Sequence, residues 1–368
     1  MSGNIIGERF QLLTFGESHG KCVGAVIDGC PAGLPLGEQD IQPELDLRKP
    51  GQSIVTTQRK EEDKVEIMSG VFNGHTTGAP IMMMIMNADK DSKSYEVINT
   101  TPRPGHADLV AKLKYGGFND YRGGGRFSGR ITASFVMAGA VAKKLLRSTL
   151  GVEIVAYSLE IGGVRASGFT LEEAAKNRYT NEARAPTPKA AEEMKKKIVE
   201  LRGKGDSLGG IVECVAVNVP VGLGEPVIGS LDSDLARFAL SIPAAKGVEF
   251  GSGFGSTRTT GLQNNDEYYY KGEKILTRTN NAGGILGGLS NGMPIVYRVA
   301  FKPASSIASK QRTVDLESGK EVDLVVPGRH DPTVVPRAVP VVENVTALVL
   351  ADYALRAGKI PPVLGGSA

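Results

Sequence analysis

The sequence predicts an α+β fold that forms one large domain over residues 1–368. Strand-like and helix-like segments both occur but do not alternate strictly along the chain, which argues against a doubly wound parallel sheet. No linker-like stretch divides the 368 residues, and a chain of this length can bury a large core. We therefore expect sheets and helices to share one core.

Six segments are predicted strands, because apolar and β-branched residues are enriched in them or alternate with polar ones: 23–27, 81–86, 152–161, 211–219, 295–301 and 321–326. Four segments have helical character: 131–147, 189–201, 233–242 and 340–358. The second of these helices places Glu192 four residues before Lys196, as expected on a solvated surface. The last helix ends at Gly358, which suits a C-cap. The polar stretch 171–206 is expected to leave the core.

Composition excludes several classes of protein. Hydrophobic residues make up 41% and charged residues 23%, as in an ordinary globular domain, and the net charge is only +3. Nothing global therefore favours a nucleic-acid or membrane partner, and any positive field must be local. Glycine is abundant, with 47 residues, and gathers in short clusters at 123–125, 283–284 and 287–288. Such clusters suit tight turns and close approach of the backbone to a ligand.

The three cysteines, Cys22, Cys30 and Cys214, have no metal-ligand spacing, and their odd number disfavours a disulfide framework. We expect no metal site. The first residues carry charges within their apolar stretch, unlike a signal peptide, and IMMMIM at 81–86 is too short to cross a bilayer. A cytoplasmic location is therefore expected. No P-loop, H-E-x-x-H or C-x-x-C motif occurs, and GSGFGS at 251–256 departs from the dinucleotide fingerprint.

Residues 121–130, YRGGGRFSGR, surround three glycines with arginines directly before the predicted helix at 131. Guanidinium groups and the N–H groups of a helix start bind anions, and glycine lets an anion reach the backbone. A single loop of this kind is equally well explained as a basic surface turn.

Three of the four histidines lie in glycine-containing loops beside arginine or serine. Histidine exchanges protons near neutral pH, so three such loops favour a site that combines an anionic substrate with proton transfer. His75 has no charged neighbour in sequence and is interpreted as structural. The loops are TFGESHG (14–20), RPGHAD (103–108) and PGRHDP (327–332), and ELDLRKPGQ (44–52) adds Arg48.

These segments together resemble the chorismate synthase family. GESHG at 16–20, GGGRFSGR at 123–130 and GRHDP at 328–332 are similar to its three signature regions, in the family's order. Six further segments fit: RKPGQ (48–52), TTQR (56–59), RPGHAD (103–108), AKGVEFGSGF (245–254), NNAGGILGG (280–288) and KPASSI (302–307). The resemblance extends over residues 5–355, nearly the whole chain.

The resemblance implies a lyase that converts 5-enolpyruvylshikimate 3-phosphate to chorismate and phosphate by 1,4-anti elimination. The family requires reduced FMN, although the reaction has no net redox change. An arginine-rich pocket suits a substrate that carries one phosphate and two carboxylates. The family resemblance also implies its own sandwich of helices between antiparallel sheets, assembled as a homotetramer. Subunit contacts and a core would both account for the apolar run at 82–86.

Carried over position by position, the resemblance assigns catalytic roles to His19 at the leaving phosphate, His106 at the flavin, and Asp331 at the flavin N5 proton. Substrate contacts are expected from Ser18, Arg48, Arg103, Arg130 and Arg329. FMN contacts are expected from Arg126, Phe127, Ser128, Pro243, Ala244, Gly287, Lys302, Pro303, Ala304, Ser305, Ser306 and Arg329, with Lys302 at the FMN phosphate.

The chain departs from the family pattern at three places. Ile54 stands where many members have a second basic residue, so the contact expected there, with substrate or with nicotinamide nucleotide, is not supplied by a charge. The resemblance assigns the nucleotide contact to the positions of Arg48 and Ile54. Pro243 and Ala244 replace a polar segment, so any FMN contact there is through the backbone. Phe127 replaces a small residue, which keeps an amide contact and loses a hydroxyl contact.

Two other functions remain open from sequence. A flavin oxidoreductase that consumes NADPH is disfavoured by the missing dinucleotide fingerprint, although NADPH is an expected source of reducing equivalents. An external flavin reductase is the alternative source. A phosphoanion or nucleic-acid binder is disfavoured by the small net charge and the absence of tryptophan.

Overall fold

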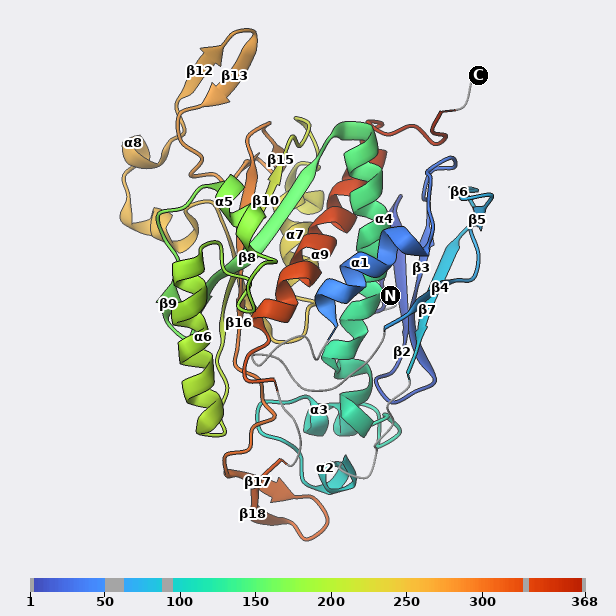
Figure 1. Cartoon of the computed structure of the whole chain (residues 1–368), viewed down its shortest axis with the longest axis vertical. Helices are drawn as coiled ribbons and strands as arrows, with labels where there is room; N and C mark the ends of the chain where they lie inside the picture. Colours follow the sequence, from blue (N-terminus) through green and yellow to red (C-terminus); the bar gives the residue numbers. More distant parts are fainter. Residues whose placement is uncertain (1–2, 50–62, 88–94, 327–330, 366–368) are drawn as a thin grey trace.

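The computed structural model describes residues 3–49, 63–87, 95–326 and 331–365. In these residues two five-stranded antiparallel sheets enclose a layer of helices (Figure 1), so the predicted α+β sandwich is confirmed. The first sheet has the order β1-β2-β3-β7-β4, with β1 Ile5–Ile6, β2 Gln11–Gly16, β3 Cys22–Asp28, β7 Ile81–Met86 and β4 Val65–Ile67. The second has the order β11-β16-β10-β8-β9, with β11 Ala245–Phe250, β16 Ile295–Phe301, β10 Gly210–Val217, β8 Glu153–Ile161 and β9 Val164–Arg165.

Three helices form the middle layer: α1 Glu38–Arg48, α4 Thr132–Leu150 and α9 Val335–Arg356. α4 packs on α9 and on β3, whereas α9 packs on β8 and β10, so the two helices connect the sheets. The shorter helices are α2 Glu96–Thr100, α3 Asp108–Lys114, α5 Leu171–Asn177, α6 Pro188–Gly203, α7 Leu231–Ala239 and α8 Gly261–Asn264. Short 3-10 segments occupy Arg122–Phe127, Gly129–Ile131, Val227–Gly229 and Gly253–Arg258, and the first of them is interrupted by three glycines with non-helical dihedral angles.

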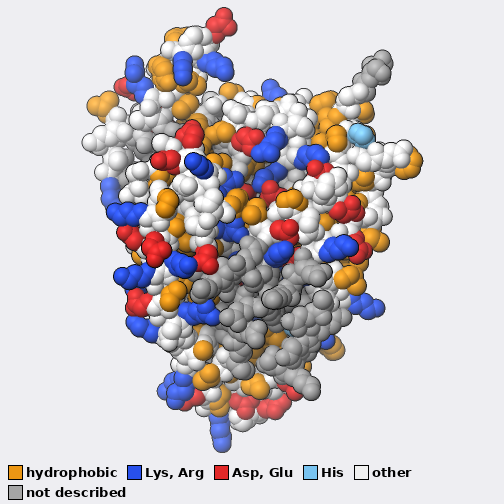
Figure 2. All heavy atoms as spheres, in the orientation of Figure 1, with side chains coloured by type: hydrophobic (Ala, Val, Ile, Leu, Met, Phe, Trp, Pro, Cys, Tyr) orange, Lys and Arg blue, Asp and Glu red, His pale blue; other side chains and the backbone are white. Residues whose placement is uncertain are grey.

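Four hairpins extend from this body: β5 Val71–Phe72 with β6 His75–Thr76, β12 Tyr268–Lys271 with β13 Lys274–Thr277, β14 Ile285–Leu286 with β15 Leu289–Ser290, and β17 Gln311–Asp315 with β18 Lys320–Leu324. The polar stretch 171–206 contributes α5 and α6, which pack on β8 and β9. Basic and acidic side chains are interspersed over this side of the molecule (Figure 2), as predicted for a solvated helix.

The run IMMMIM of β7 follows the period of two of a strand with one face in the core. Ile81, Met83 and Ile85 are buried, whereas Met82 and Met84 are partly exposed and Met86 is 53% exposed. β8 differs, because both of its faces are covered. One face of β8 lies against the main core. On the other face, Val155, Tyr157 and Leu159 pack near Ala174 of α5. This double burial explains the nearly continuous apolar sequence.

α4 and α9 cross at close range at Gly139. A Cβ placed on Gly139 would lie 2.3 Å from the Asn344 Cβ and 2.6 Å from its main-chain oxygen. Only glycine fits at such a distance, so this residue sets how closely the two helices pack.

Glu343, on α9 beside this crossing, is a fully buried carboxylate with several donors. Its oxygens lie 3.2 Å from Lys143 Nζ, 3.0 Å from Arg178 Nε and 3.0 Å from the Tyr179 hydroxyl, and the Ala156 amide donates to it at 2.8 Å. Burial alone would raise the pKa of Glu343, but Lys143 and Arg178 outweigh it and the pKa is lowered. The Glu343 carboxylate therefore links α4, α9, β8 and the polar stretch 171–206.

Asp352, near the end of α9, holds the beginning of the described chain. Its Oδ1 accepts from the amides of Glu8, Arg9 and Phe10 at 2.9, 2.6 and 2.8 Å. Among the described helices, α9 is also the one whose length and hydropathy would allow it to cross a membrane, but 94% of its most apolar window lies inside the protein. α9 is thus a core helix.

All four predicted helices and all six predicted strands lie in regular elements, with shifts of a few residues at the ends. α9 begins at Val335, five residues before the predicted start, because Pro336 is accommodated in its first turn. α1 is not predicted from the sequence, because it carries Pro43 in its interior and has a polar composition.

Gly139→Ala is expected to destabilise the protein by about 1–3 kcal/mol, because its methyl group would force α4 and α9 apart. Thermal and urea unfolding would measure the loss. The matched control is Gly203→Ala in α6, where nothing lies within 4 Å of the added Cβ. Equal stability of the two variants would contradict the close crossing.

Candidate active site

A turn of three glycines, Gly123 to Gly125, lies at the centre of the candidate site. Its φ angles are 58°, 82° and 51°, all in the left-handed region that glycine adopts without strain. A Cβ on Gly123 would lie 2.1 Å from the His19 ring, and one on Gly124 would lie 3.1 Å from His106 Cε1. The turn therefore separates the two predicted catalytic histidines by the width of a bare backbone.

His19 lies in the turn between β2 and β3 and is only 3% exposed. Its ring contacts Tyr95 edge-on, with centroids 5.1 Å apart. Asn87, directly after β7, fixes this turn because its Nδ2 donates to the carbonyls of Glu17 and Gly20 at 2.9 and 3.0 Å. The Ser18 amide donates to Gly125 O at 3.2 Å, which joins the histidine turn to the glycine turn.

His106 shares the carboxylate of Asp108 with Arg103. Asp108 Oδ1 lies 2.6 Å from His106 Nδ1, and both Asp108 oxygens accept from Arg103 at 2.8 Å. Arg103 Nη2 is 3.1 and 3.2 Å from the two ring nitrogens of His106. In-plane lone pairs of these nitrogens diverge, so the guanidinium lies against the ring rather than bonding to both. Asp108 thus orients His106 with Nδ1 as its donor.

Burial would raise the pKa of Asp108, but hydrogen bonds from Arg103 and His106 outweigh it and lower the pKa well below 3.8. The carboxylate remains ionised at neutral pH and stabilises the positive charge of Arg103.

The predicted cofactor segment 302–306 lies against the His106 loop. Arg103 Nη1 donates to the Ser306 hydroxyl at 2.8 Å, and Gly105 O accepts from Lys302 Nζ at 3.0 Å and from Ser305 at 2.7 Å. The Lys302 amide donates to Ala244 O at 2.9 Å, so the segment Pro243 and Ala244 is adjacent as well. Burial and the nearby Lys246 lower the pKa of Lys302. The structure brings these predicted cofactor residues together.

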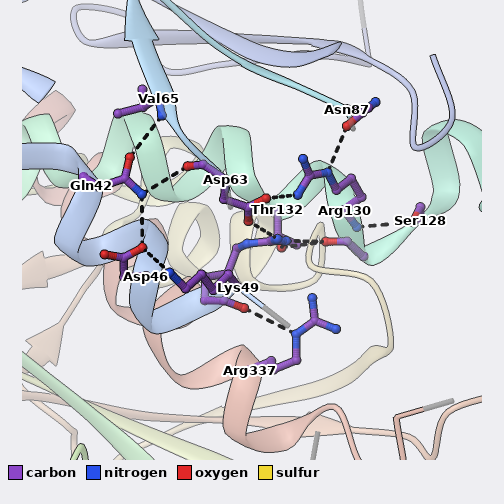
Figure 3. A network of polar contacts seen from close by, with 12 residues as sticks. Gln42, Asp46, Lys49, Asp63, Val65, Asn87, Ser128, Arg130, Thr132 and Arg337 are labelled. Carbon is purple, nitrogen blue, oxygen red and sulfur yellow. Dashed lines mark hydrogen bonds and ion pairs between the residues drawn. The ribbon is translucent and has the colours of Figure 1, made fainter. Parts of the chain in front are cut away.

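Arg48 and Arg130 converge on one carboxylate, Asp63 (Figure 3). Arg48 Nη2 lies 2.8 Å from Asp63 Oδ2, and Arg130 Nη1 binds Asp63 Oδ1. Arg130 Nε also donates to Asn87 Oδ1 at 3.1 Å. Asn87 therefore links the arginine pair to the His19 turn.

Asp331 is paired with Arg337 in the first turn of α9, with 2.6 Å between Oδ2 and Nη1. Arg337 Nε also donates to the Arg48 main-chain oxygen at 3.3 Å (Figure 3). Asp331 is thereby connected to the arginine pair.

Several predicted site residues lie elsewhere or are turned away. The Arg126 guanidinium donates to Asn4, Thr14 and Gly16, so it is bound to β2 and to the residue before β1. A cofactor could contact Arg126 only through the Arg126 backbone. Ser128 accepts from the Arg130 amide at 3.2 Å, and the 37% exposed Phe127 ring lies beside Tyr115. Gly287 is in the β14–β15 turn, near the opposite end of the molecule from α3 (Figure 1). Arg329 and Ile54 lie outside the described residues.

Asp63 and Asn87 are not predicted from the sequence as site residues, and Asp108 and Arg337 have no predicted role. Asp63 lies in the charged run EEDK, which is typical of a solvated loop. A hollow of about 580 Å³ on the second sheet, lined by residues such as Tyr157, Phe169 and Met293, includes no predicted site residue in its lining. In the described residues no group of three or more His, Cys, Asp or Glu side chains could hold a metal ion.

Asp108→Asn should cost about 1–3 kcal/mol of stability at neutral pH, because Arg103 loses its counter-ion and His106 loses a carboxylate acceptor. A lowered carboxylate pKa stabilises the fold above the unfolded-state value, and that stability is lost as the pH falls through the folded-state value. The difference from wild type should therefore shrink below about pH 4 in urea unfolding at a series of pH values. A difference that stays constant from pH 3 to pH 8 would refute this account. The exposed Asp323→Asn is the control.

Gly123→Ala should displace the His19 ring, whereas Gly117→Ala should not. Both positions have positive φ, at +58° and +83°, so both variants bear the backbone cost of about 1–2 kcal/mol. Only at Gly123 does the added Cβ meet His19; nothing lies within 4 Å at Gly117. NMR signals of the labelled His19 ring would report the displacement. Identical histidine spectra in the two variants would show that the Gly123 methyl group does not contact the His19 ring.

Comparison with known proteins identifies the family. The family model for chorismate synthase matches residues 10–355. The chain is 57% identical to a chorismate synthase of Korarchaeum cryptofilum over 97% of its length and 98% of that protein's. It is 51% identical to one of Methanosarcina mazei, over 98% and 99% of the two chains. A crystal structure of chorismate synthase matches with a TM-score of 0.75 and 34% identity, covering 96% of this chain and 93% of the other. The chain therefore belongs to the chorismate synthase family.

Proposed function

We propose that the enzyme converts 5-enolpyruvylshikimate 3-phosphate to chorismate and phosphate by 1,4-anti elimination, with reduced FMN as cofactor. The observation that carries this proposal is the placement of His19 and His106 against successive glycines of one turn, with Arg103 and Arg130 beside them. Such a site can neutralise an anion and deliver or hold protons at two nearby points.

The arginines suit the substrate's charges. Arg48, Arg103 and Arg130 are each bonded to a carboxylate, which fixes the direction of the guanidinium. Together with Arg329 they would hold the phosphate and the two carboxylates. Ser18, which is 7% exposed beside His19, would contact the leaving phosphate.

The residues present fit a bound FMN. Lys302 and the Ser305 and Ser306 hydroxyls form a donor set suited to a phosphate, and Lys246 adds positive charge. The partly exposed Phe127 beside Tyr115 offers an aromatic surface, and the backbone of Ala244 is adjacent to Lys302. Pro303 and Ala304 complete the segment. Reduced FMN, when bound, supplies electron density to the breaking C–O bond and recovers it afterwards.

The protein's own residues manage the protons. His19 would protonate the departing phosphate, because it is the histidine beside Ser18. His106, oriented by Asp108, would hold a proton next to the cofactor segment. Asp331, oriented by Arg337, would accept a proton at the cofactor site. The nearly complete burial of His19 and Arg130 excludes water from these steps.

We also propose a homotetrameric, cytoplasmic enzyme whose FMN is reduced with NADPH, either by the protein itself or by an external reductase.

The decisive assay is anaerobic incubation with 5-enolpyruvylshikimate 3-phosphate and pre-reduced FMN. Chorismate and phosphate should form one-to-one, with the flavin still reduced at the end. Net flavin oxidation would indicate an oxidoreductase instead.

His19→Ala and His106→Ala should fail differently in this assay. Loss of a general acid lowers turnover by about 10²–10⁴-fold, and we expect this of His19→Ala with the reduced-flavin spectrum unchanged. His106→Ala should slow turnover and also alter that spectrum. The exposed His75→Ala on β6 is the control. A spectral change in His19→Ala alone would reverse the two assignments.

A further inference from the structure

Asp63 presents one carboxylate to two guanidinium groups from different parts of the fold. Its side chain is fully enclosed, and those of Arg48 and Arg130 are 1% and 6% exposed. Each carboxylate oxygen takes one arginine, Oδ2 from α1 and Oδ1 from the start of α4 (Figure 3). The cluster holds two positive charges and one negative charge, so it keeps a net attraction for an anion.

The remaining donors of these arginines are also directed by the protein. Arg48 Nη1 donates to Gly129 O and Thr132 Oγ1 at 3.3 Å, and Arg130 Nε donates to Asn87. Each guanidinium is thus fixed from two sides, with Asp63 as the shared point. Two like charges at this range repel one another, and the carboxylate between them offsets that repulsion. Arg48 and Arg130 outweigh the effect of burial and keep the pKa of Asp63 low.

The backbone around Asp63 is held in an uncommon conformation. Its φ is +48°, in the left-handed region that aspartate and asparagine tolerate better than most residues. Gln42 of α1 holds the chain that leaves Asp63, since its Nε2 donates to Asp63 O at 3.1 Å and its Oε1 accepts from the Val65 amide at 3.1 Å. A conformation secured in this way indicates a specific purpose for the side chain.

We propose that Asp63 is a positioning residue that aligns Arg48 and Arg130 on the anionic substrate and on the charge of the departing phosphate. This proposal rests on the proposed function. Without the negative charge, the two guanidiniums separate and the site gains a net positive charge. Substrate binding then changes little, because extra attraction offsets poorer alignment, whereas stabilisation of the transition state is lost.

The test is Asp63→Asn, which keeps the shape and the backbone preference of the residue and removes its charge. We expect kcat to fall at least about tenfold while KM changes less than about threefold. KM should also rise more steeply with salt than in wild type, because the arginine charge is no longer compensated. Asp323→Asn is the control. It removes the same charge from β18, where Asp323 pairs with Lys310 at 2.8 Å, away from the two arginines.

Retention of wild-type kcat and salt dependence in Asp63→Asn would overturn the proposal. So would a loss of activity that matches the loss of folded protein, with an unchanged salt dependence, because Asp63 would then be purely structural. If wild type forms no chorismate, the proposed function fails, and Asp63 is judged by calorimetric binding of inorganic phosphate. Unequal salt dependence of phosphate binding in Asp63→Asn and wild type then supports positioning of the arginines, and equal dependence contradicts it.

Discussion

The close crossing of α4 and α9 is the constraint on which the site depends. Gly139 lies seven residues after Thr132, and Asn344 lies nine residues after Val335. At 1.5 Å per residue, both helices therefore start about 10–14 Å from the crossing, and their N-termini lie at the same end of the middle layer (Figure 1). The chain entering α4 carries Arg130, and the chain entering α9 carries Asp331. Helix packing in the core thus sets where these groups meet.

Acidic residues decide what the arginines of the site can do. Asp63, Asp108 and Asp331 each bind an arginine, and Asp120 pairs with Arg122 at 2.8 Å on the rim. A cluster of arginines without these partners would repel itself and adopt many orientations. The carboxylates reduce the net charge and select one direction for each guanidinium. The small net charge of the whole chain agrees with such local pairing.

Local patterns in the sequence predicted much of the fold and the residue types of the site. The period of β7 and the apolar run of α4 are local signals. The glycine cluster at 123–125 is another, and in the structure it lies against His19 and His106. Asp63 could not be recognised, because its partners lie 15 and 67 residues away and its own neighbours look like a surface loop. The guanidinium of Arg126 could not be oriented, because its acceptors belong to another strand and to Asn4.

The central place of α9 governs when the protein can fold during synthesis. This helix supplies Glu343 to the core and Asp352 to the amides of Glu8, Arg9 and Phe10, yet it begins only at Val335. More than 330 residues leave the ribosome before the two sheets acquire the helix between them. The faces of β8 and β10 that α9 covers therefore stay exposed until α9 has been made, so the core closes only at that point, and apolar faces exposed until then favour aggregation.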